Sequence, residues 1–349
     1  MHVLALILAG AVSFGLTPLL CRLAPRLGAV DKPDARKIHR GLMPRLGGVA
    51  IYAGFVAAFC FLGYRESEYT GLFLGGTLIM LVGLVDDIKN ISPRLKLLGQ
   101  IAAAALLVAF GVRVEFLTNP FDGLLMLGKL AVPVTIFWIV GVTNALNLVD
   151  GLDGLAAGTS FIAAVTIAVV AWLNGEREVA LLSLALAASI LGFLPFNFHP
   201  ARTFMGDCGS MFLGFNLASL AVIGLTKSAT VISLFIPVVI LGLPILDTFL
   251  AIVRRLYNHR PIFAPDKGHL HHCLLAQGLT QRQAVAVIYL VNACLGASAV
   301  LLTRLTTDQG VLILVGLAVL ILLGCDRLGV LGKRRVPRIK TRHNSLPML

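Results

Sequence analysis

The chain has 349 residues, of which 58% are hydrophobic and 13% are charged, with a net charge of +12 and a mean hydropathy of +0.91. A soluble domain normally carries about 25% charged residues, so this composition excludes an ordinary water-soluble protein. A positive net charge is also typical of nucleic-acid binding, but here the basic residues follow the boundaries of apolar segments, and we expect no nucleic-acid partner.

Apolar segments recur along the whole chain, and several exceed the roughly 18 residues needed to cross a bilayer. Helices are the expected spanning structure, because lipid offers no partner for an unpaired backbone amide. We therefore predict an all-α, polytopic integral membrane protein with about eleven transmembrane helices. They cover residues 3–21, 47–63, 71–85, 97–111, 130–149, 155–172, 179–196, 208–225, 230–253, 284–303 and 310–325.

The basic residues predict the orientation of these helices. If the N-terminus lies outside, 23 of the 29 Lys and Arg residues fall in the inside segments, as the positive-inside rule requires. An odd number of spans then makes the C-terminus cytoplasmic. We predict one transmembrane domain over residues 1–325 and a basic cytoplasmic tail over residues 326–349.

The first long inside segment, residues 22–46, carries seven basic residues and leads into the second span through Pro44-Arg45-Leu46-Gly47-Gly48. Its charge fits an interface with anionic membrane lipids or with a nucleotide phosphate. Glycines at a helix start are typical of anion sites, so we expect Arg45 and this turn to bind a substrate phosphate.

The third span ends in two adjacent acids, Asp86 and Asp87, followed by Lys89. Neighbouring carboxylates repel each other, which a bound cation or a raised pKa on one of them would relieve. A helix cap needs only one acid, so we assign the pair to catalysis, with Asp87 also near a metal. Lys89 is predicted to contact substrate.

Polar side chains recur at every third residue across the end of the fifth span, at Asn144, Asn147, Asp150 and Asp153. On a helix this spacing gives one slowly rotating stripe, and glycines at 151 and 154 let the backbone turn closely around a ligand. The two carboxylates are catalytic candidates and the two amides substrate-binding candidates, with Asn147 also near the metal. A polar seam between helices is the alternative.

An aspartate between glycines, Asp207, opens the eighth span in the sequence Phe204-Met205-Gly206-Asp207-Cys208-Gly209-Ser210. Mg²⁺ takes one or two carboxylates together with phosphate oxygens and water. Asp207 is therefore the candidate metal ligand, with Mg²⁺ as the expected ion and Mn²⁺ as the alternative.

The longest inside segment, residues 254–283, holds Arg260 and three histidines in four residues, His269, His271 and His272. A structural zinc site usually wants four ligands, often including thiolates, and so compact a run cannot easily wrap one ion. We expect these four residues to bind a polyanionic substrate.

Taken together, these motifs resemble the polyprenyl-phosphate N-acetylhexosamine-1-phosphate transferases, the superfamily of WecA, TagO and MraY. The matching segments are 44–48, 86–87, 144–155, 204–210 and 269–272, in the family's order. The His-Leu-His-His sequence, the loop from Asp31 to His39 and the eleven spans are closer to the WecA/TagO branch. The resemblance is specific and covers most of the chain.

The resemblance implies a reaction and its partners. A UDP-N-acetylhexosamine, by default UDP-N-acetylglucosamine, would give its sugar phosphate to undecaprenyl or another polyprenyl phosphate, releasing UMP for cell-envelope polysaccharide synthesis. By the same resemblance Asp207 leads the Mg²⁺ ligands, and Asp86 or Asp87 activates the lipid phosphate. The site would face the cytoplasm at a bacterial inner membrane, and a homodimer stays open.

Two other readings compete with this one. Many spans with buried acids also fit a secondary transporter or lipid flippase, whose site lies near the bilayer midplane between repeats; here the acids gather at one surface and no repeat is visible. A CDP-alcohol phosphotransferase would carry a spaced aspartate signature that this chain lacks.

Overall fold

The computed structural model describes residues 1–31, 41–118, 124–225, 235–259, 261 and 268–327. Helices dominate these residues, and the strands form only two short antiparallel hairpins, β1–β2 (Val30–Asp31 and Met43–Pro44) and β3–β4 (Phe116–Thr118 and Leu124–Met126). The prediction of an all-α protein is confirmed. The helices are α1 (His2–Leu27), α2 (Gly47–Leu62), α3 (Ser67–Lys89), α4 (Pro93–Ala109), α5 (Ala131–Val149), α6 (Leu155–Leu173), α7 (Arg177–Asn197), α8 (Gly206–Leu225), α9 (Phe235–Ile240), α10 (Gly242–Tyr257), α11 (Leu270–Ala276), α12 (Gln281–Leu302) and α13 (Thr307–Arg327), with a 3₁₀ turn, η1 (Gly128–Leu130), before α5.

Seven of the described helices are long and apolar enough to cross a membrane, and α2 and α13 contain shorter apolar stretches. Each of the eleven predicted spans falls on one or two helices, so a multi-pass membrane protein follows from length and composition. The count of eleven and the orientation remain predictions. The proposed tail lies almost entirely outside the described residues, as do Asp34 to His39 and Arg260.

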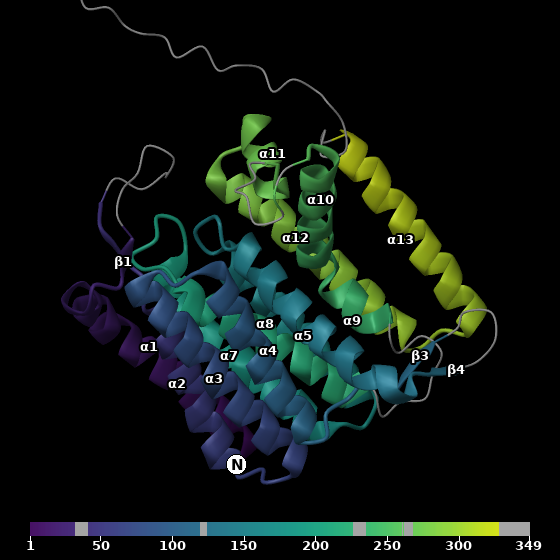
Figure 1. The fold of residues 1–349 in the computed structure, drawn as a ribbon, viewed down its shortest axis with the longest axis horizontal. Helices are drawn as coiled ribbons and strands as arrows, with labels where there is room; N and C mark the ends of the chain where they lie inside the picture. The colour runs from purple at the N-terminus through teal and green to yellow at the C-terminus, as the bar shows by residue number, and fades with distance from the viewer. Residues whose placement is uncertain (32–40, 119–123, 226–234, 260, 262–267, 328–349) are drawn as a thin grey trace, which may run out of the picture.

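The ninth predicted span, residues 230–253, contains Pro237 and Pro244, and its helix is interrupted within the described residues. Its described part is divided between α9, which ends at Ile240, and α10, which begins at Gly242. Pro244 has no N–H to donate to the carbonyl of Ile240, so the helical ladder is interrupted at this point. The break lets α10 take its own course toward the end of the bundle where α11 lies (Figure 1).

Helices α1 to α8 form a bundle in which successive long helices alternate in direction, while α9 to α13 lie along one side of it (Figure 1). β1 and α11 lie at one end of the bundle, and the N-terminus, β3 and β4 lie at the other. The alternation brings the ends of α3, α5 and α7 and the starts of α4, α6 and α8 to the β1 end. All the predicted site residues that the structure describes therefore belong to this end.

Glycines allow the closest helix contacts beneath this end of the bundle. A Cβ atom on Gly48 of α2 would lie 2.2 Å from the backbone nitrogen of Gly209, and one on Gly83 of α3 would lie 2.5 Å from the Cα of Cys208. Small residues are common where membrane helices approach this closely. The start of α8 is thus packed directly against α2 and α3, with Asp207 in fixed register beside the end of α3.

Candidate active site

Two carboxylates from different helices face one ammonium group at the β1 end of the bundle. Lys96, in the first turn of α4, lies with its Nζ 2.8 Å from Oδ2 of Asp86 and also donates to Oδ2 of Asp207. Asp86 ends α3 and Asp207 begins α8, so three helix ends converge on one cation position. None of the motifs recognised in the sequence includes Lys96.

Asn147 holds Asp207 from the other side. Its Nδ2 donates to Oδ1 of Asp207 at 2.9 Å and to Oγ of Ser210 at 2.8 Å, and Ser210 Oγ donates in turn to the carbonyl of Gly206. Both oxygens of Asp207 are therefore engaged in defined contacts. Asn147 and Asp207, which the sequence assigns to the same metal site, are thus in direct contact.

Asp87 has a different position from its neighbour Asp86. Its side chain is fully buried, and its two oxygens accept the backbone N–H groups of Asp207 and Cys208, each at 2.9 Å. The carboxylate thus satisfies amides that the start of α8 would otherwise leave unpaired. Gly206, at φ 71°, leaves room for it, since a Cβ there would lie 2.5 Å from Oδ2 of Asp87. Asp87 fixes the α8 start, whereas Asp86 faces the shared cation.

Arg45 lies beside the same aspartates, with its Nε 3.7 Å from Oδ1 of Asp87 and its Nη1 3.9 Å from Oδ1 of Asp31. The backbone around it pairs with the segment before Asp207: the amides of Gly47 and Gly48 donate to the carbonyls of Phe204 and Met205. The expectation that these glycine amides bind an anion is wrong, because they are already satisfied. Their role is close packing, which leaves the guanidinium of Arg45 as the cationic group of this turn.

Asn144 lies one turn deeper in α5 and forms a reciprocal amide pair with Gln100 of α4. Its Nδ2 donates to Oε1 of Gln100 at 2.7 Å, and Gln100 Nε2 donates back at 3.3 Å. This pair ties α4 to α5 directly below Lys96 and Asn147, so in this structure Asn144 joins the two helices.

The two aspartates of the α5–α6 turn differ in their surroundings. Asp150 follows the last residue of α5 at the membrane boundary, where burial and then the negative charge of Asp207 raise its pKa to about 7. Asp153 instead hydrogen-bonds through Oδ2 to Nδ1 of His199 at 2.7 Å and to the amide of Ala201 at 3.1 Å. Asp150 belongs electrostatically to the acidic site, while Asp153 secures the turn after α7.

The histidines of α11 reach this turn from the side of the bundle. The His271 ring packs on Gly151, since a Cβ there would lie 2.6 Å from Nε2 of His271. His271 also stacks with His269, with ring centroids 5.8 Å apart, and contacts His272 at 4.2 Å. Burial, and then the neighbouring His272, lower the pKa of His271 to about 4, so its ring is neutral near pH 7.

Two predicted substrate contacts are not brought into this cluster by the described structure. Lys89 is exposed at the end of α3, and Arg260 lies outside the described residues.

The residues present fit a Mg²⁺ site that substrate completes. Among the described residues no group of three or more His, Cys, Asp or Glu side chains could hold a metal ion by itself. Two carboxylate oxygens, from Asp86 and Asp207, nevertheless converge on one cation position. Mg²⁺ is usually held by one or two carboxylates together with substrate phosphates and waters, so this donor set is chemically appropriate.

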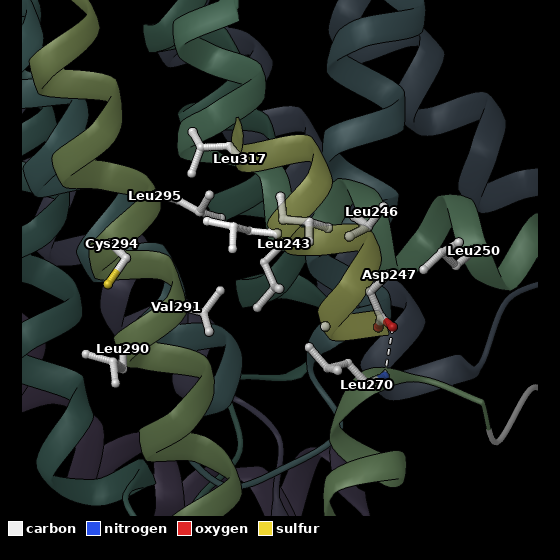
Figure 2. A pocket seen from close by; sticks show the side chains of 13 residues that line it. Leu243, Leu246, Asp247, Leu250, Leu270, Leu290, Val291, Cys294, Leu295 and Leu317 are labelled. Atoms are coloured by element: carbon white, nitrogen blue, oxygen red, sulfur yellow. Dashed lines mark hydrogen bonds between the residues drawn. The ribbon is translucent and has the colours of Figure 1, made fainter. Parts of the chain in front are cut away.

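Beside the histidines, α10 to α13 enclose an apolar cavity of about 370 Å³. Figure 2 shows leucines of α10 and α12 pointing into it, with Asp247 of α10 at its wall and a hydrogen bond from the amide of Leu270 to this carboxylate. None of the motifs recognised in the sequence includes Asp247.

The chain is similar in sequence to known proteins. The sequence profile of glycosyl transferase family 4 matches residues 69–225, which hold all the aspartates and amides above except Asp31 and Asp247. The probable undecaprenyl-phosphate N-acetylglucosaminyl 1-phosphate transferase of Bacillus subtilis strain 168 is 47% identical over 293 residues, covering 83% of this chain and 82% of that protein.

More distant relatives carry related names. A decaprenyl-phosphate N-acetylglucosaminephosphotransferase of Mycobacterium tuberculosis H37Rv is 38% identical over 314 residues, covering 81% of this chain and 78% of that protein. An undecaprenyl-phosphate alpha-N-acetylglucosaminyl 1-phosphate transferase of Escherichia coli O157:H7 is 30% identical over 331 residues, covering 92% and 90%. The chain therefore belongs to glycosyl transferase family 4, among the WecA/TagO-like polyprenyl-phosphate N-acetylhexosamine-1-phosphate transferases that its motifs predicted.

Proposed function

We propose that this protein transfers N-acetylglucosamine-1-phosphate from UDP-N-acetylglucosamine to undecaprenyl phosphate in a Mg²⁺-dependent reaction that releases UMP. One observation carries the proposal: Asp86 and Asp207, from two helices, share a single cation position at one end of a membrane bundle. The names of the relatives supply the acceptor and the sugar phosphate. The choice of UDP as carrier rests on the resemblance of the motifs.

In this reaction an oxygen of the lipid phosphate attacks the β-phosphorus of the UDP-sugar. A new phosphorus–oxygen bond forms, and the bond from the β-phosphorus to the oxygen that bridges to the α-phosphorus breaks. UMP leaves with that oxygen, and the sugar stays attached to the β-phosphate. The nucleophile and the donor are both anions, so the protein must offset their repulsion and the charge that develops on UMP.

The cationic side chains of the site suit this task. Lys96 lies between two carboxylates and is placed to contact the donor diphosphate when substrate enters, and Arg45 supplies a second positive charge beside Asp87. Asp207 and Asp86 would hold Mg²⁺, which would supply Lewis-acid stabilisation of the charge on the phosphates. Asp87 holds the start of α8, and with it Asp207, in place.

The remaining residues bind and orient the substrates. Asp150 is placed at the membrane boundary, where a carboxylate with a raised pKa can exchange a proton with the acceptor phosphate. The histidines of α11 would contact the sugar phosphate from the other side, with His271 as a neutral hydrogen-bonding group. Since a lipid phosphate and a cytosolic nucleotide must meet at the membrane surface, we assign this end of the bundle to the cytoplasmic face of a bacterial inner membrane.

The test is nucleotide release from purified protein in detergent, with undecaprenyl phosphate, a panel of UDP-sugars, and either Mg²⁺ or EDTA. The proposal expects UMP only when lipid, UDP-N-acetylglucosamine and Mg²⁺ are all present. UMP released with another UDP-sugar alone would refute the assigned donor. Counterflow of substrate in proteoliposomes without UMP release would refute the reaction and favour the transporter reading.

A further inference from the structure

We propose that Asp247 is a positioning residue for the reaction, acting through His269 to hold the histidines of α11 against the acidic site. The proposal deepens the proposed function and rests on it, since it concerns the substrate-binding role given to these histidines. Asp247 lies in α10, 22 residues before His269 in the chain.

Both carboxylate oxygens of Asp247 contact the start of α11. Oδ2 lies 2.8 Å from Nδ1 of His269. Oδ1 accepts the amide of Leu270 at 2.8 Å (Figure 2). His269 is the N-cap residue of α11, and its own side chain makes no capping bond. The carboxylate therefore supplies from outside the acceptor that the start of this helix lacks.

The same contact fixes the protonation pattern of the His269 ring. An ionised carboxylate can only accept hydrogen bonds, so Nδ1 must carry a proton and Nε2 is the nitrogen left for a ligand when the ring is neutral. Carboxylate–histidine pairs of this kind orient imidazoles in many catalytic and metal sites.

The contact between Asp247 and His269 is linked to the acidic site through the stacked rings of His269 and His271. His269 lies parallel to His271 with an interplanar angle of 9°, and His271 packs on Gly151 in the turn that follows Asp150. Arg254 lies two helical turns beyond Asp247 in α10. It packs over Gly268, immediately before His269. Loss of the Asp247 contact would therefore release the ring that supports His271 at the turn.

The setting of Asp247 argues against a purely solvated acid. Its side chain is 5% exposed, and the adjoining cavity is walled by Leu243, Leu246 and Leu250 of the same helix. A carboxylate in such surroundings is costly unless it is fully hydrogen-bonded. Its two partners, His269 Nδ1 and Leu270 N, meet that need and both belong to the histidine segment.

A double-mutant cycle tests the proposal with full-length protein in detergent. Steady-state UMP release is measured for wild type, Asp247→Asn, His269→Ala and the double variant, with Thr248→Val as the matched control on the next residue of α10. If Asp247 acts through His269, each single change lowers kcat about 10- to 100-fold, and the double variant is no slower than His269→Ala. Thr248→Val keeps wild-type kcat.

Two outcomes would overturn the proposal. Asp247→Asn with wild-type kcat would remove any role in turnover, and losses that multiply in the double variant would show that Asp247 acts independently of His269. Absence of UMP from the wild type would refute the proposed function instead, and would leave the positioning contact to be judged by a measurement that needs no turnover.

That measurement is the ¹⁵N spectrum of the wild-type protein with labelled histidines, with the His269 signals assigned by their loss in His269→Asn. The contact with Asp247 requires a proton on Nδ1 of His269. A spectrum in which this nitrogen is unprotonated near neutral pH would overturn the proposal, and it does so even if Asp247→Asn fails to fold.

Discussion

The acidic site and the histidine segment are built in different ways, although they meet at one turn. The acidic site is formed by the ends of α3, α4, α5 and α8, and glycines at 48, 83 and 209 bring α2, α3 and α8 into close contact beneath it. The histidine segment, residues 269–276, comprises His269 and the short α11 (Figure 1), and it is held by the Asp247 carboxylate, by ring stacking and by Leu274, which is buried in the hydrophobic core.

The difference implies a division of labour. A rigid set of helix ends keeps charged groups in the fixed geometry that phosphoryl transfer needs. A short segment on a few contacts can close over or leave a substrate with small energetic cost. Changes in the acidic site should therefore abolish chemistry, whereas changes at the histidine contact should weaken it while leaving the bundle intact.

The largest effect is expected for Asp207→Asn. This change removes a carboxylate that Lys96 and Asn147 both contact, and we predict a loss of about 10²- to 10³-fold or more in the rate of UMP release. Ser219→Ala, a buried change deeper in α8, is the control and should retain activity. Full activity in Asp207→Asn would contradict the metal assignment.

Removal of the shared cation should come next. Lys96→Gln removes the ammonium group that is placed to contact the donor diphosphate, and we predict about 10²-fold slower transfer. Arg94→Gln removes the same charge from an exposed position on the same helix and isolates the local effect from net charge. Equal losses in the two variants, measured by UMP release, would show that Lys96 acts only through net charge.

A methyl group on residue 151, where His271 contacts the turn after α5, should distinguish the contribution of the histidine segment from that of the acidic site. Gly151→Ala places a Cβ where it would lie 2.6 Å from Nε2 of His271, whereas Gly141→Ala meets nothing within 4 Å. We predict about tenfold lower kcat/KM for Gly151→Ala with an unchanged thermal midpoint, and wild-type values for Gly141→Ala. A matching drop in the thermal midpoint would mean that the bundle, and not the histidine contact, was damaged.

The smallest expected effect is on pH dependence. Burial raises the pKa of Asp150 to about 7, so this group becomes protonated as the pH falls through 7 and its carboxylate is lost. If the carboxylate serves in transfer, kcat/KM should fall several-fold from about pH 8 to pH 6. The acceptor phosphate also titrates, but it does so in every variant, so the pH profile of kcat/KM for Asp150→Asn is the comparison. Wild-type and Asp150→Asn profiles of identical shape would contradict a role for the Asp150 carboxylate.

Helix positions were well predicted from the sequence because membrane spans are set by length and apolarity. Pro237 and Pro244 indicate an interruption in the ninth span, but the composition of this apolar run does not reveal that α9 stops at Ile240. The aspartates of the site were found because adjacent or regularly spaced acids at membrane depth are costly. The resemblance of the motifs to a known family then assigned a role to each of them.

Lys96 and Asp247 were missed for opposite reasons. Lys96 was attributed to the positive-inside rule, although Lys96 and Gln100 are one helical turn apart on one face of an otherwise apolar helix, a signal that could have been read. Asp247 pairs with His269 only because the chain breaks between α9 and α10 and brings α10 beside α11. The separate positions of Asp86 and Asp87 likewise depend on α8, which their adjacency in sequence cannot reveal.

The central claim is that the β-phosphate moves with the sugar to the lipid. It is tested most directly with UDP-N-acetylglucosamine carrying ³²P at the β-phosphorus, purified protein, undecaprenyl phosphate and Mg²⁺. The account predicts label in the lipid fraction and an equal amount of unlabelled UMP in water. Label that remains in the aqueous phase as UDP, with sugar alone on the lipid, would contradict it.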